Sequence, residues 1–468
     1  MTASPNVPLQ SMGATISSIA RQAWPVLVGQ WASIAFGVID TAMTGHASPA
    51  DLAAMSLSAS IYITVFVGLM GVLHALIPIL AQHYGAQRHH EVGRLWGQGV
   101  WLALGLSVVG GAVMQFPDTW LSMSGNVDPE VRQRMASYLE ALTLALPAML
   151  VFRTIYALGT AVSRPRVVMM INLAAVLLKA FFSWMFIYGR LGLPAMGAVG
   201  AGLSTALVSW IYMAVGLWFI SHDKGFARFR LRLGWPQWQP LKELLRLGLP
   251  MGGSYLVEVM AFTFMALLVA REGTYVLGGH QIMSNLAALC YMMPMSIGVA
   301  SAAITAQSVG AADMPQARRT GWAGLALGLM GALLTSAIVL AGRPLIIAAY
   351  TSDAQVALAA GSLVAMMPLF HLWDATQCIN AYLLRAYKIA VMPLMIQTLA
   401  LAGVGLLGGW WFGFGPGLGG LDKAIAILMP GAHTGVGSLW LMAMAGLGLS
   451  GLLLHGWYWR TLRRLHAD

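Results

Sequence analysis

Residues 322–342 read WAGLALGLMGALLTSAIVLAG, an apolar run without one charged side chain. A run of about 20 apolar residues is long enough to cross the hydrocarbon core of a membrane as a helix. Similar runs occupy residues 100–116, 142–162 and 196–220. Of the 468 residues, 58% are hydrophobic and 9% are charged, whereas a soluble domain carries about 25% charged residues. The sequence therefore predicts an all-α membrane protein.

Twelve transmembrane helices are expected. They are placed at residues 16–42, 52–80, 95–116, 136–161, 168–188, 195–220, 246–270, 275–307, 322–342, 357–383, 390–413 and 436–459. Of the 26 Lys and Arg residues, eighteen then fall on one side of the membrane and six on the other, while Arg153 and Lys179 lie inside helices. Because basic loops stay in the cytoplasm, both termini are expected there, in the inner membrane of a bacterium. The same loops explain the net charge of +10, so the expected partners of these charges are membrane lipids and not nucleic acid.

The second half of the chain repeats the first at an offset of 225 residues, at which Pro25 matches Pro250 and Arg94 matches Arg319. Six helices per repeat, an even number, keep the two halves parallel in the membrane, an arrangement typical of secondary transporters. We expect two pseudo-symmetric six-helix lobes, residues 1–235 and residues 236–468. Because both lobes are fused in one chain, a functional monomer is expected.

Three carboxylates, Asp40, Glu258 and Asp374, interrupt apolar helices. An aspartate at the bilayer centre costs about 3 kcal/mol on insertion scales, so such groups usually have a function. Holding or carrying a cation would explain all three. For Asp40 the alternative is a position near solvent at the outer end of its helix. No ATP-binding cassette is recognisable, so an ion gradient is the expected energy source.

Several segments occur in a fixed order. They are GVIDTAMTG at 37–45, GLP at 248–250 followed by Glu258, HQ at 280–281 with Asn285, PMSIG at 294–298, DATQ at 374–377 and RAYK at 385–388. With these segments the chain resembles the multidrug and toxic compound extrusion (MATE) family, in its NorM-type branch. The resemblance implies an antiporter that exports small amphiphilic, often cationic compounds in exchange for sodium ions or protons.

The resemblance also implies roles for single residues. Asp40 matches the acidic residue of the first lobe that is implicated in cation coupling, and Glu258 and Asp374 match the acidic pair of the second lobe. Gln281 and Asn285 match polar positions that face the interior of the second lobe.

Sodium and protons make different demands on Glu258 and Asp374. A sodium ion requires several oxygen ligands, which two carboxylates with carbonyl and amide groups can supply. A proton requires a single buried carboxyl. Phe370 stands where relatives usually carry Tyr, which removes one oxygen ligand. A structural pair bonded to hydroxyls or to Gln377 is the alternative, and the coupling ion, H+ or Na+, stays open. No other cofactor or metal is expected.

Lys179 lies within VLLKAFF at 176–182, where relatives usually carry Asn. We hypothesise that Lys179 pairs with Asp40 as a tethered internal cation. Such a pair would keep Asp40 charged and would leave ion coupling to the second lobe. Pairing with a helix carbonyl or a lipid phosphate is the alternative.

Aromatic and Met side chains are candidates to line a substrate cavity, because aromatic faces hold cations and Met adapts to varied shapes. The candidates, each also explained by core packing, are Trp31, Phe36, Tyr255, Phe262, Met283, Met293 and Phe370. Arg153 is interpreted as a contact between helices, since it would repel a cationic drug.

Two other functions are considered. A lipid-linked saccharide flippase of related fold is the alternative within transport. It would favour a basic cavity for a pyrophosphate, whereas three acids and two bases are predicted inside the membrane here. An intramembrane enzyme would need a nucleophile with its base, or facing metal ligands, and no such cluster is recognisable in the sequence.

Overall fold

A computed structural model of the chain describes residues 10–116 and 129–465. Within these two stretches the chain is helical and contains no strand. Eleven of the described helices are long and apolar enough to cross a membrane, and a bent pair of helices raises the number of possible spans to twelve. The prediction of an all-α, multi-pass membrane protein is confirmed.

The chain divides into two compact units. Residues 25–256 form one, here called the N-unit, and residues 10–24 together with 257–465 form the other, here called the C-unit. The expected lobes, 1–235 and 236–468, follow the covalent duplication, and that division stays a prediction.

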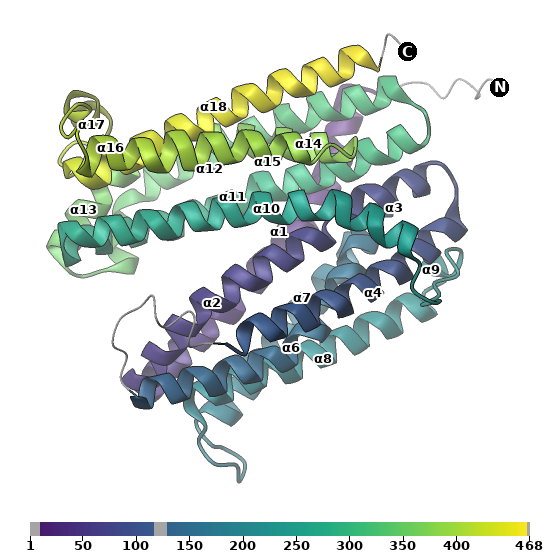
Figure 1. Ribbon diagram of the computed structural model, residues 1–468, viewed down its shortest axis with the longest axis horizontal. Coiled ribbons are helices and arrows are strands. Elements are labelled where there is room, and N and C mark those ends of the chain that lie inside the picture. Colours follow the sequence, from purple (N-terminus) through teal and green to yellow (C-terminus); the bar gives the residue numbers. More distant parts are fainter. Residues whose placement is uncertain (1–9, 117–128, 466–468) are drawn as a thin grey trace. The chain divides into compact units, whose positions relative to one another are not determined.

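The N-unit is a bundle of long helices (Figure 1). Its elements are α1 (Met12–Ala47) from Pro25 onward, α2 (Pro49–Leu73), α3 (Leu76–Gly85), α4 (His89–Met114), α6 (Pro129–Ala161), α7 (Pro165–Ile187), α8 (Gly197–His222), α9 (Lys224–Ala227) and α10 (Trp238–Val269) up to Leu256. The central helix is α6, which packs against α2, α4 and α8. Within its apolar 18-residue stretch, 72% of the residues are buried. In contrast, α7 buries mainly one narrow stripe that contains Ala175, Lys179 and Ser183.

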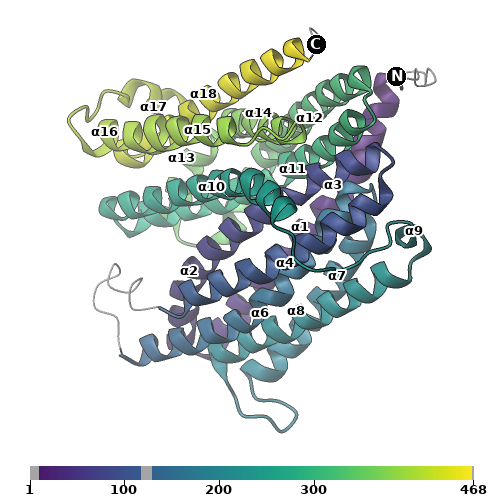
Figure 2. The same cartoon turned by 45° about the vertical axis from the view of Figure 1, so that its right-hand side comes forward.

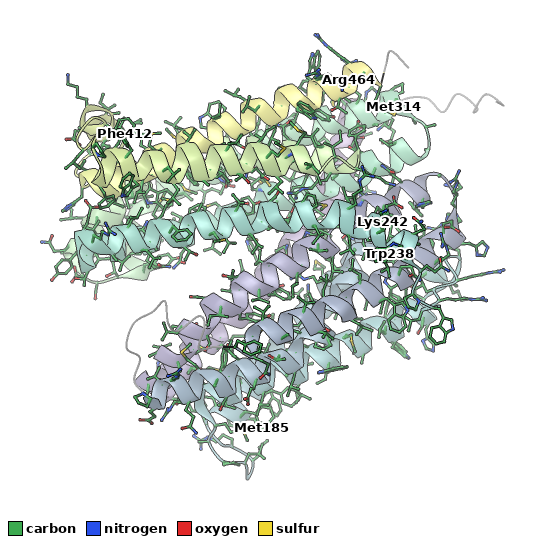
Figure 3. The ribbon with its side chains drawn as sticks, viewed as in Figure 1. Met185, Trp238, Lys242, Met314, Phe412 and Arg464 are labelled. Atoms are coloured by element: carbon green, nitrogen blue, oxygen red, sulfur yellow. The ribbon has the colours of Figure 1, made fainter. Side chains whose placement is uncertain are left out.

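The C-unit is a second helical bundle. Beyond its parts of α1 and α10 it contains η1 (Ala270–Glu272), α11 (Thr274–Gly310), α12 (Met314–Tyr350), α13 (Ala354–Val364), α14 (Met367–Ala386), α15 (Val391–Gln397), the π-helix η2 (Thr398–Leu407), α16 (Gly408–Phe414), α17 (Asp422–Leu428) and α18 (Thr434–Arg464). Figure 3 shows Met314 and Arg464 at one end of this unit and Phe412 at the other. The start of α12 and the end of α18 therefore lie on the same side of the bundle.

Two of the expected spans are interrupted. The helices α13 and α14 meet at an angle of 52°, within the expected helix 357–383. The helices α2 and α3 are separated at His74 and Ala75, within the expected helix 52–80. A proline follows each break, Pro368 and Pro78. Proline lacks an N–H and its ring clashes with the carbonyl four residues earlier, which breaks the helix at these points.

The segment between α9 and α10, residues 228–237, lies along α4 and is called the strap here (Figure 2). A Cβ atom added at Gly93 or at Gly97 would come within 2.1 Å of a strap carbonyl oxygen, so only glycine permits this approach. Gln98, the residue after Gly97, forms two hydrogen bonds with the strap. Its Nε2 donates to the carbonyl of Trp235 at 2.9 Å, and its Oε1 accepts from the backbone N–H of Gln237 at 2.7 Å. The strap is thus a structural part of the N-unit.

Each unit contains the first part of a helix whose remainder belongs to the other unit. Ile19 and Ala23, near the start of α1, lie in an apolar core of the C-unit with residues of α11, α12 and α14. In the N-unit, Tyr255 of α10 forms a 3.1 Å hydrogen bond with His74, and Gly252 packs closely against the backbone of Gly68. The duplicated first helices α1 and α10 are both divided in this way.

Candidate functional site

A buried ion pair joins Lys179 of α7 to Asp40 of α1 inside the N-unit. The Nζ atom lies 2.6 Å from Oδ1 of Asp40, and the side chains are 0% and 9% exposed. The hypothesis that these two residues pair is confirmed. The helix α1 continues to Ala47, so Asp40 does not lie at a solvated helix end.

Three further acceptors, all on α8, surround the Lys179 ammonium. The carbonyl oxygen of Ala201 lies at 2.9 Å, Oγ of Ser204 at 2.6 Å and Oγ1 of Thr205 at 2.7 Å. An ammonium has three N–H groups, so its hydrogen-bonding capacity is filled. The approach is possible because α8 is rich in small residues here, and Gly200 packs on the backbone of α7. Lys179 therefore occupies the place beside Asp40 that an external cation would take.

The C-unit contains the second charged cluster. Glu258 of α10 and Asp374 of α14 lie close enough to interact electrostatically, and Asp374 is 4% exposed. The hydroxyl of Tyr291, on α11, hydrogen-bonds to Glu258, and the Arg385 guanidinium also acts on this carboxylate. The two acids that the sequence singled out are thus brought together, with one hydroxyl and one cation beside them.

Amide side chains extend this cluster along α14. Gln377 follows Asp374 by one turn and lies near its carboxylate. The Nε2 of Gln397 donates to the Oε1 of Gln377 at 2.8 Å, and both side chains are buried. One turn further, Asn380 forms a 3.2 Å hydrogen bond with His455 of α18. Cys290 and Cys378 are also buried in this unit, and both are free thiols.

Gln281 and Asn285 lie outside the packed core of the C-unit. Both are exposed on α11 and hydrogen-bond to each other at 3.4 Å. The buried face of this turn of α11 is formed by Ile282, Met283 and Leu286. Helical spacing thus places these two amides off the packed apolar face of α11, so the expectation that they face the lobe interior stays a prediction.

Three cavity candidates are packed inside the units. Met283 and Phe370 are 0% and 1% exposed within the C-unit core, and Tyr255 is 7% exposed. The Phe370 ring lies 5.1 Å from that of Trp440 and 6.5 Å from that of Phe262, which packs against the same core. These side chains serve packing in this conformation. The remaining candidates are Trp31, which is 48% exposed, and Phe36 and Met293, which are partly buried.

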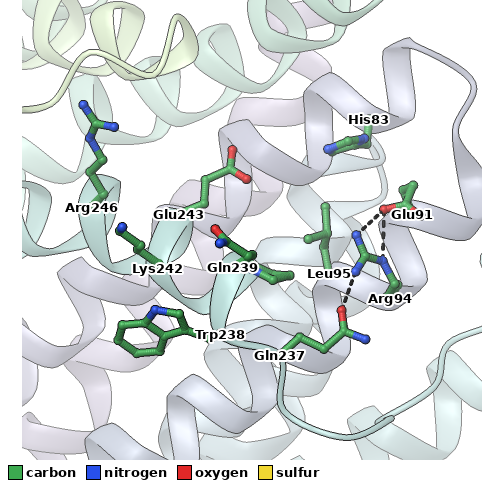
Figure 4. Close-up of a pocket in the computed structure, with 11 residues that line it drawn as sticks. His83, Glu91, Arg94, Leu95, Gln237, Trp238, Gln239, Lys242, Glu243 and Arg246 are labelled. Carbon is green, nitrogen blue, oxygen red and sulfur yellow. Dashed lines mark hydrogen bonds and ion pairs between the residues drawn. The ribbon is translucent and has the colours of Figure 1, made fainter.

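One cavity of about 940 Å3 lies in the N-unit, between the start of α4 and the start of α10 (Figure 4). Arg94, Lys242 and Arg246 line it together with Glu91 and Glu243. Arg94 is bonded to Glu91 at 2.7 Å and to Gln237. None of the three intramembrane acids contributes to its lining, so this cavity is separate from the charged clusters.

The sequence did not single out Tyr291, Arg385, Ser204 or Thr205 as partners of the charged residues. A tyrosine in an apolar helix looks like any packed aromatic residue, and hydroxyl residues are common in spans. The one available signal was the position of Arg385 in the RAYK segment. Only the packing of α8, α11 and α14 identifies the four side chains as partners of charged groups.

A duplicated helical membrane protein with buried charged residues inside each unit has the architecture of a secondary transporter. The chain belongs to the MatE family, whose family model matches residues 25–185 and 250–411. The two matched segments begin at Pro25 and Pro250, so the internal duplication at an offset of 225 residues is confirmed.

Curated relatives cover most of the chain. A probable multidrug resistance protein NorM of Aromatoleum aromaticum is 38% identical over 84% of this chain and 85% of its own length. Its counterpart in Chromobacterium violaceum is 33% identical over 97% and 96%. The multidrug resistance protein MdtK of Yersinia pseudotuberculosis is 32% identical over 85% and 87%.

Solved structures share the fold. The eukaryotic MATE transporter AtDTX14 superposes with a TM-score of 0.85 at 17% identity, over 97% of this chain and 98% of that one. The Vibrio cholerae MATE transporter VcmN in its bent form gives a TM-score of 0.83 at 16% identity over the same shares.

Proposed function

We propose that this chain is a secondary active exporter of amphiphilic, often cationic compounds, driven by a cation gradient through alternating access. Relatives named as multidrug resistance proteins support this function. The observation that carries the proposed mechanism is the C-unit cluster of Glu258 and Asp374. A chain that maintains two interacting carboxylates inside a membrane uses them to bind a cation.

The N-unit pair supports placing ion coupling in the C-unit. Asp40 is already neutralised by Lys179 at 2.6 Å, and the ammonium is enclosed by acceptors. An external cation would have to displace a covalently attached one. We therefore assign ion coupling to Glu258 and Asp374, with Asp40 and Lys179 as a fixed internal pair.

The surroundings of the C-unit acids favour a proton over sodium. A sodium ion needs several oxygen ligands in one shell. Phe370 supplies none and is packed among aromatic rings. A proton needs only one carboxylate. Proton binding then favours one state of the transporter, and substrate binding favours the other.

The proposed setting is the inner membrane of a bacterium, with both termini in the cytoplasm and the monomer as the working unit. The distribution of Lys and Arg over the loops supports this orientation. No catalytic role is proposed.

The test uses purified protein in sealed liposomes with rhodamine 123, a fluorescent lipophilic cation. A pH gradient and a sodium gradient are imposed separately on the wild type, Glu258→Gln, Asp374→Asn and the control Glu243→Gln, which changes an exposed carboxylate of α10. We expect the wild type to transport the dye when the pH gradient alone is imposed. Glu258→Gln and Asp374→Asn should lose this transport, and the control Glu243→Gln should keep it. Export that persists in both Glu258→Gln and Asp374→Asn would refute the coupling site. Transport driven only by sodium would refute the proton assignment.

A further inference from the structure

The cavity of about 940 Å3 between the starts of α4 and α10 has no part in the proposed transport mechanism. Figure 4 shows charged side chains from both helices around it, Glu91 and Arg94 from α4, and Lys242, Glu243 and Arg246 from α10. All of its lining residues belong to the N-unit. Pockets that bind small molecules usually measure about 300–1,000 Å3, so a group of the size of a lipid headgroup fits here.

The charges that line this cavity do not balance. Arg94 is paired with Glu91 at 2.7 Å. Lys242 and Arg246, one turn apart on α10, form no ion pair among the residues that the structure describes. Three cations stand against two carboxylates, which leaves one positive charge in excess when His83 is neutral. A ligand with a single negative charge would compensate this excess.

Tryptophan side chains mark the same region as a contact with the membrane surface. Trp238 lines the cavity and is 68% exposed, and Trp235 of the strap is 86% exposed. On α4, the indole N–H of Trp101 donates to the carbonyl of Gly234 in the strap at 2.9 Å. Large exposed apolar groups mark interaction surfaces, and tryptophan is enriched where lipid meets water. The cavity therefore lies at the depth of the lipid headgroups.

We propose that this cavity binds the headgroup of an anionic phospholipid, with Lys242 and Arg246 at its phosphodiester and Trp238 beside its acyl chains. A phosphodiester carries one negative charge, which matches the excess of the lining. Ammonium and guanidinium groups both bind phosphate oxygens. Gln239, which also lines the cavity, offers an amide to the headgroup hydroxyls. The inference depends on neither the exported substrate nor the coupling ion.

Two features favour an anionic lipid over other phosphates. A zwitterionic headgroup brings its own cation close to Lys242 and Arg246, so its binding gains less. A soluble phosphate leaves Trp235 and Trp238 in water, whereas the acyl chains of a lipid cover them. A lipid bound here would join the start of α4 to the start of α10, the helix that continues into the C-unit.

Native mass spectrometry of the purified protein in detergent counts bound lipids. Phosphatidylglycerol and phosphatidylcholine with the same acyl chains are titrated separately, and glycerophosphoglycerol, the headgroup of the first lipid without its chains, is added as a soluble competitor. The variants are Lys242→Gln/Arg246→Gln, the exchange Lys242→Arg/Arg246→Lys, which keeps both charges, and Trp238→Ala. The control Arg463→Gln/Arg464→Gln removes two exposed Arg residues at the end of α18.

We expect the wild type to bind one phosphatidylglycerol at least about tenfold more tightly than phosphatidylcholine. Lys242→Gln/Arg246→Gln should lose this preference, whereas the exchange variant and the control should keep it. Trp238→Ala should weaken the binding of both lipids and keep the preference.

Equal binding of the two lipids by the wild type would overturn the proposal, and so would an unchanged preference in Lys242→Gln/Arg246→Gln. Loss of the preference in the exchange variant would refute the role of the two charges. Displacement of the lipid by glycerophosphoglycerol at equal concentration would refute the lipid and assign the cavity to a soluble phosphodiester. Because no transport is measured, failure of the export function would leave these outcomes unchanged.

Discussion

Removing either member of the Asp40–Lys179 pair leaves one buried charge without its partner. In Lys179→Met, the Asp40 carboxylate keeps two long hydrogen bonds from the described residues, one from Ser183 at 3.3 Å and one from Thr205 at 3.5 Å. In Asp40→Asn, the ammonium keeps Ala201, Ser204 and Thr205 but loses the compensating charge. Breaking a buried pair from one side costs about 3–5 kcal/mol, whereas replacing both partners by neutral groups is often nearly neutral.

The unpaired carboxyl can take up a proton, and the unpaired ammonium can release one. The free energy of that step sets an upper limit on the stability that each single variant loses. A carboxyl with the ordinary pKa of about 3.9 costs about 4 kcal/mol to protonate at pH 7, and an amine with the ordinary pKa of about 10.4 costs about 5 kcal/mol to deprotonate. The first cost falls by about 1.4 kcal/mol for each pH unit downward, and the second falls equally for each pH unit upward. The two single variants should therefore respond to pH in opposite directions.

Thermal unfolding in detergent, followed by tryptophan fluorescence between pH 5 and pH 9, measures these effects. For a unit of roughly 230 residues, 1 kcal/mol corresponds to roughly 2 °C, so a loss of 4 kcal/mol lowers the unfolding midpoint by about 8 °C. Lowering the pH should reduce the difference in unfolding midpoint between Lys179→Met and the wild type. Raising the pH should reduce the same difference for Asp40→Asn. The double variant should unfold near the wild-type midpoint at every pH and should regain the export that each single variant loses.

A control pair in the same unit is Asp51→Asn with Arg134→Met. Its side chains are 12% and 32% exposed, so each change should cost only about 1 kcal/mol. Additive losses in the double variant Asp40→Asn/Lys179→Met, or the same pH response in both single variants, would refute a coupled buried pair.

Three further predictions concern packing. Phe370→Tyr buries a hydroxyl among the rings of Trp440 and Phe262, so the unfolding midpoint should fall by the equivalent of about 1–3 kcal/mol without any gain in sodium-driven transport. A sodium-driven gain would show that the tyrosine oxygen reaches the cation site. Gly97→Ala forces the strap away from α4, so trypsin should cleave at Arg230 and Arg232 faster than in the wild type; equal cleavage rates would mean that the strap is held elsewhere. Glu272→Gln weakens the two hydrogen bonds, at 3.0 and 2.7 Å, with which this carboxylate caps the start of α18. A loss of about 1 kcal/mol in thermal unfolding is expected, and a midpoint identical to that of the wild type would exclude the cap.

The spans were predictable because long apolar runs leave a chain few other options in a membrane. Helix ends were less predictable. The helix α10 was expected to begin at 246 but begins at Trp238. Lys242 and Arg246 looked like loop residues, whereas a helix that extends beyond the membrane accepts charges freely. The breaks before Pro78 and Pro368 depend on whether packing tolerates a kink, which the sequence does not encode locally.

The charged residues of the site were predictable, but their neutral partners were not. A carboxylate or an ammonium in an apolar helix is conspicuous, since burial of a charge is costly. That Lys179 pairs with Asp40 was a hypothesis from the sequence, with a helix carbonyl or a lipid phosphate as the alternative. The hydroxyls of Tyr291, Ser204 and Thr205 carry no such signal, and the face of α11 that holds Gln281 depends on which neighbours α11 packs against.

The divided helices α1 and α10 bear on how such a chain arose. If an ancestral six-helix protein worked as a symmetric dimer, each copy gave the beginning of its first helix to its partner, as in domain swapping. A gene fusion of two such copies would place both exchanged segments in one chain, which is the division of α1 and α10 found here. The two halves of the present chain, cut at residue 235 and expressed apart, should therefore fold poorly alone and assemble when they are synthesised together.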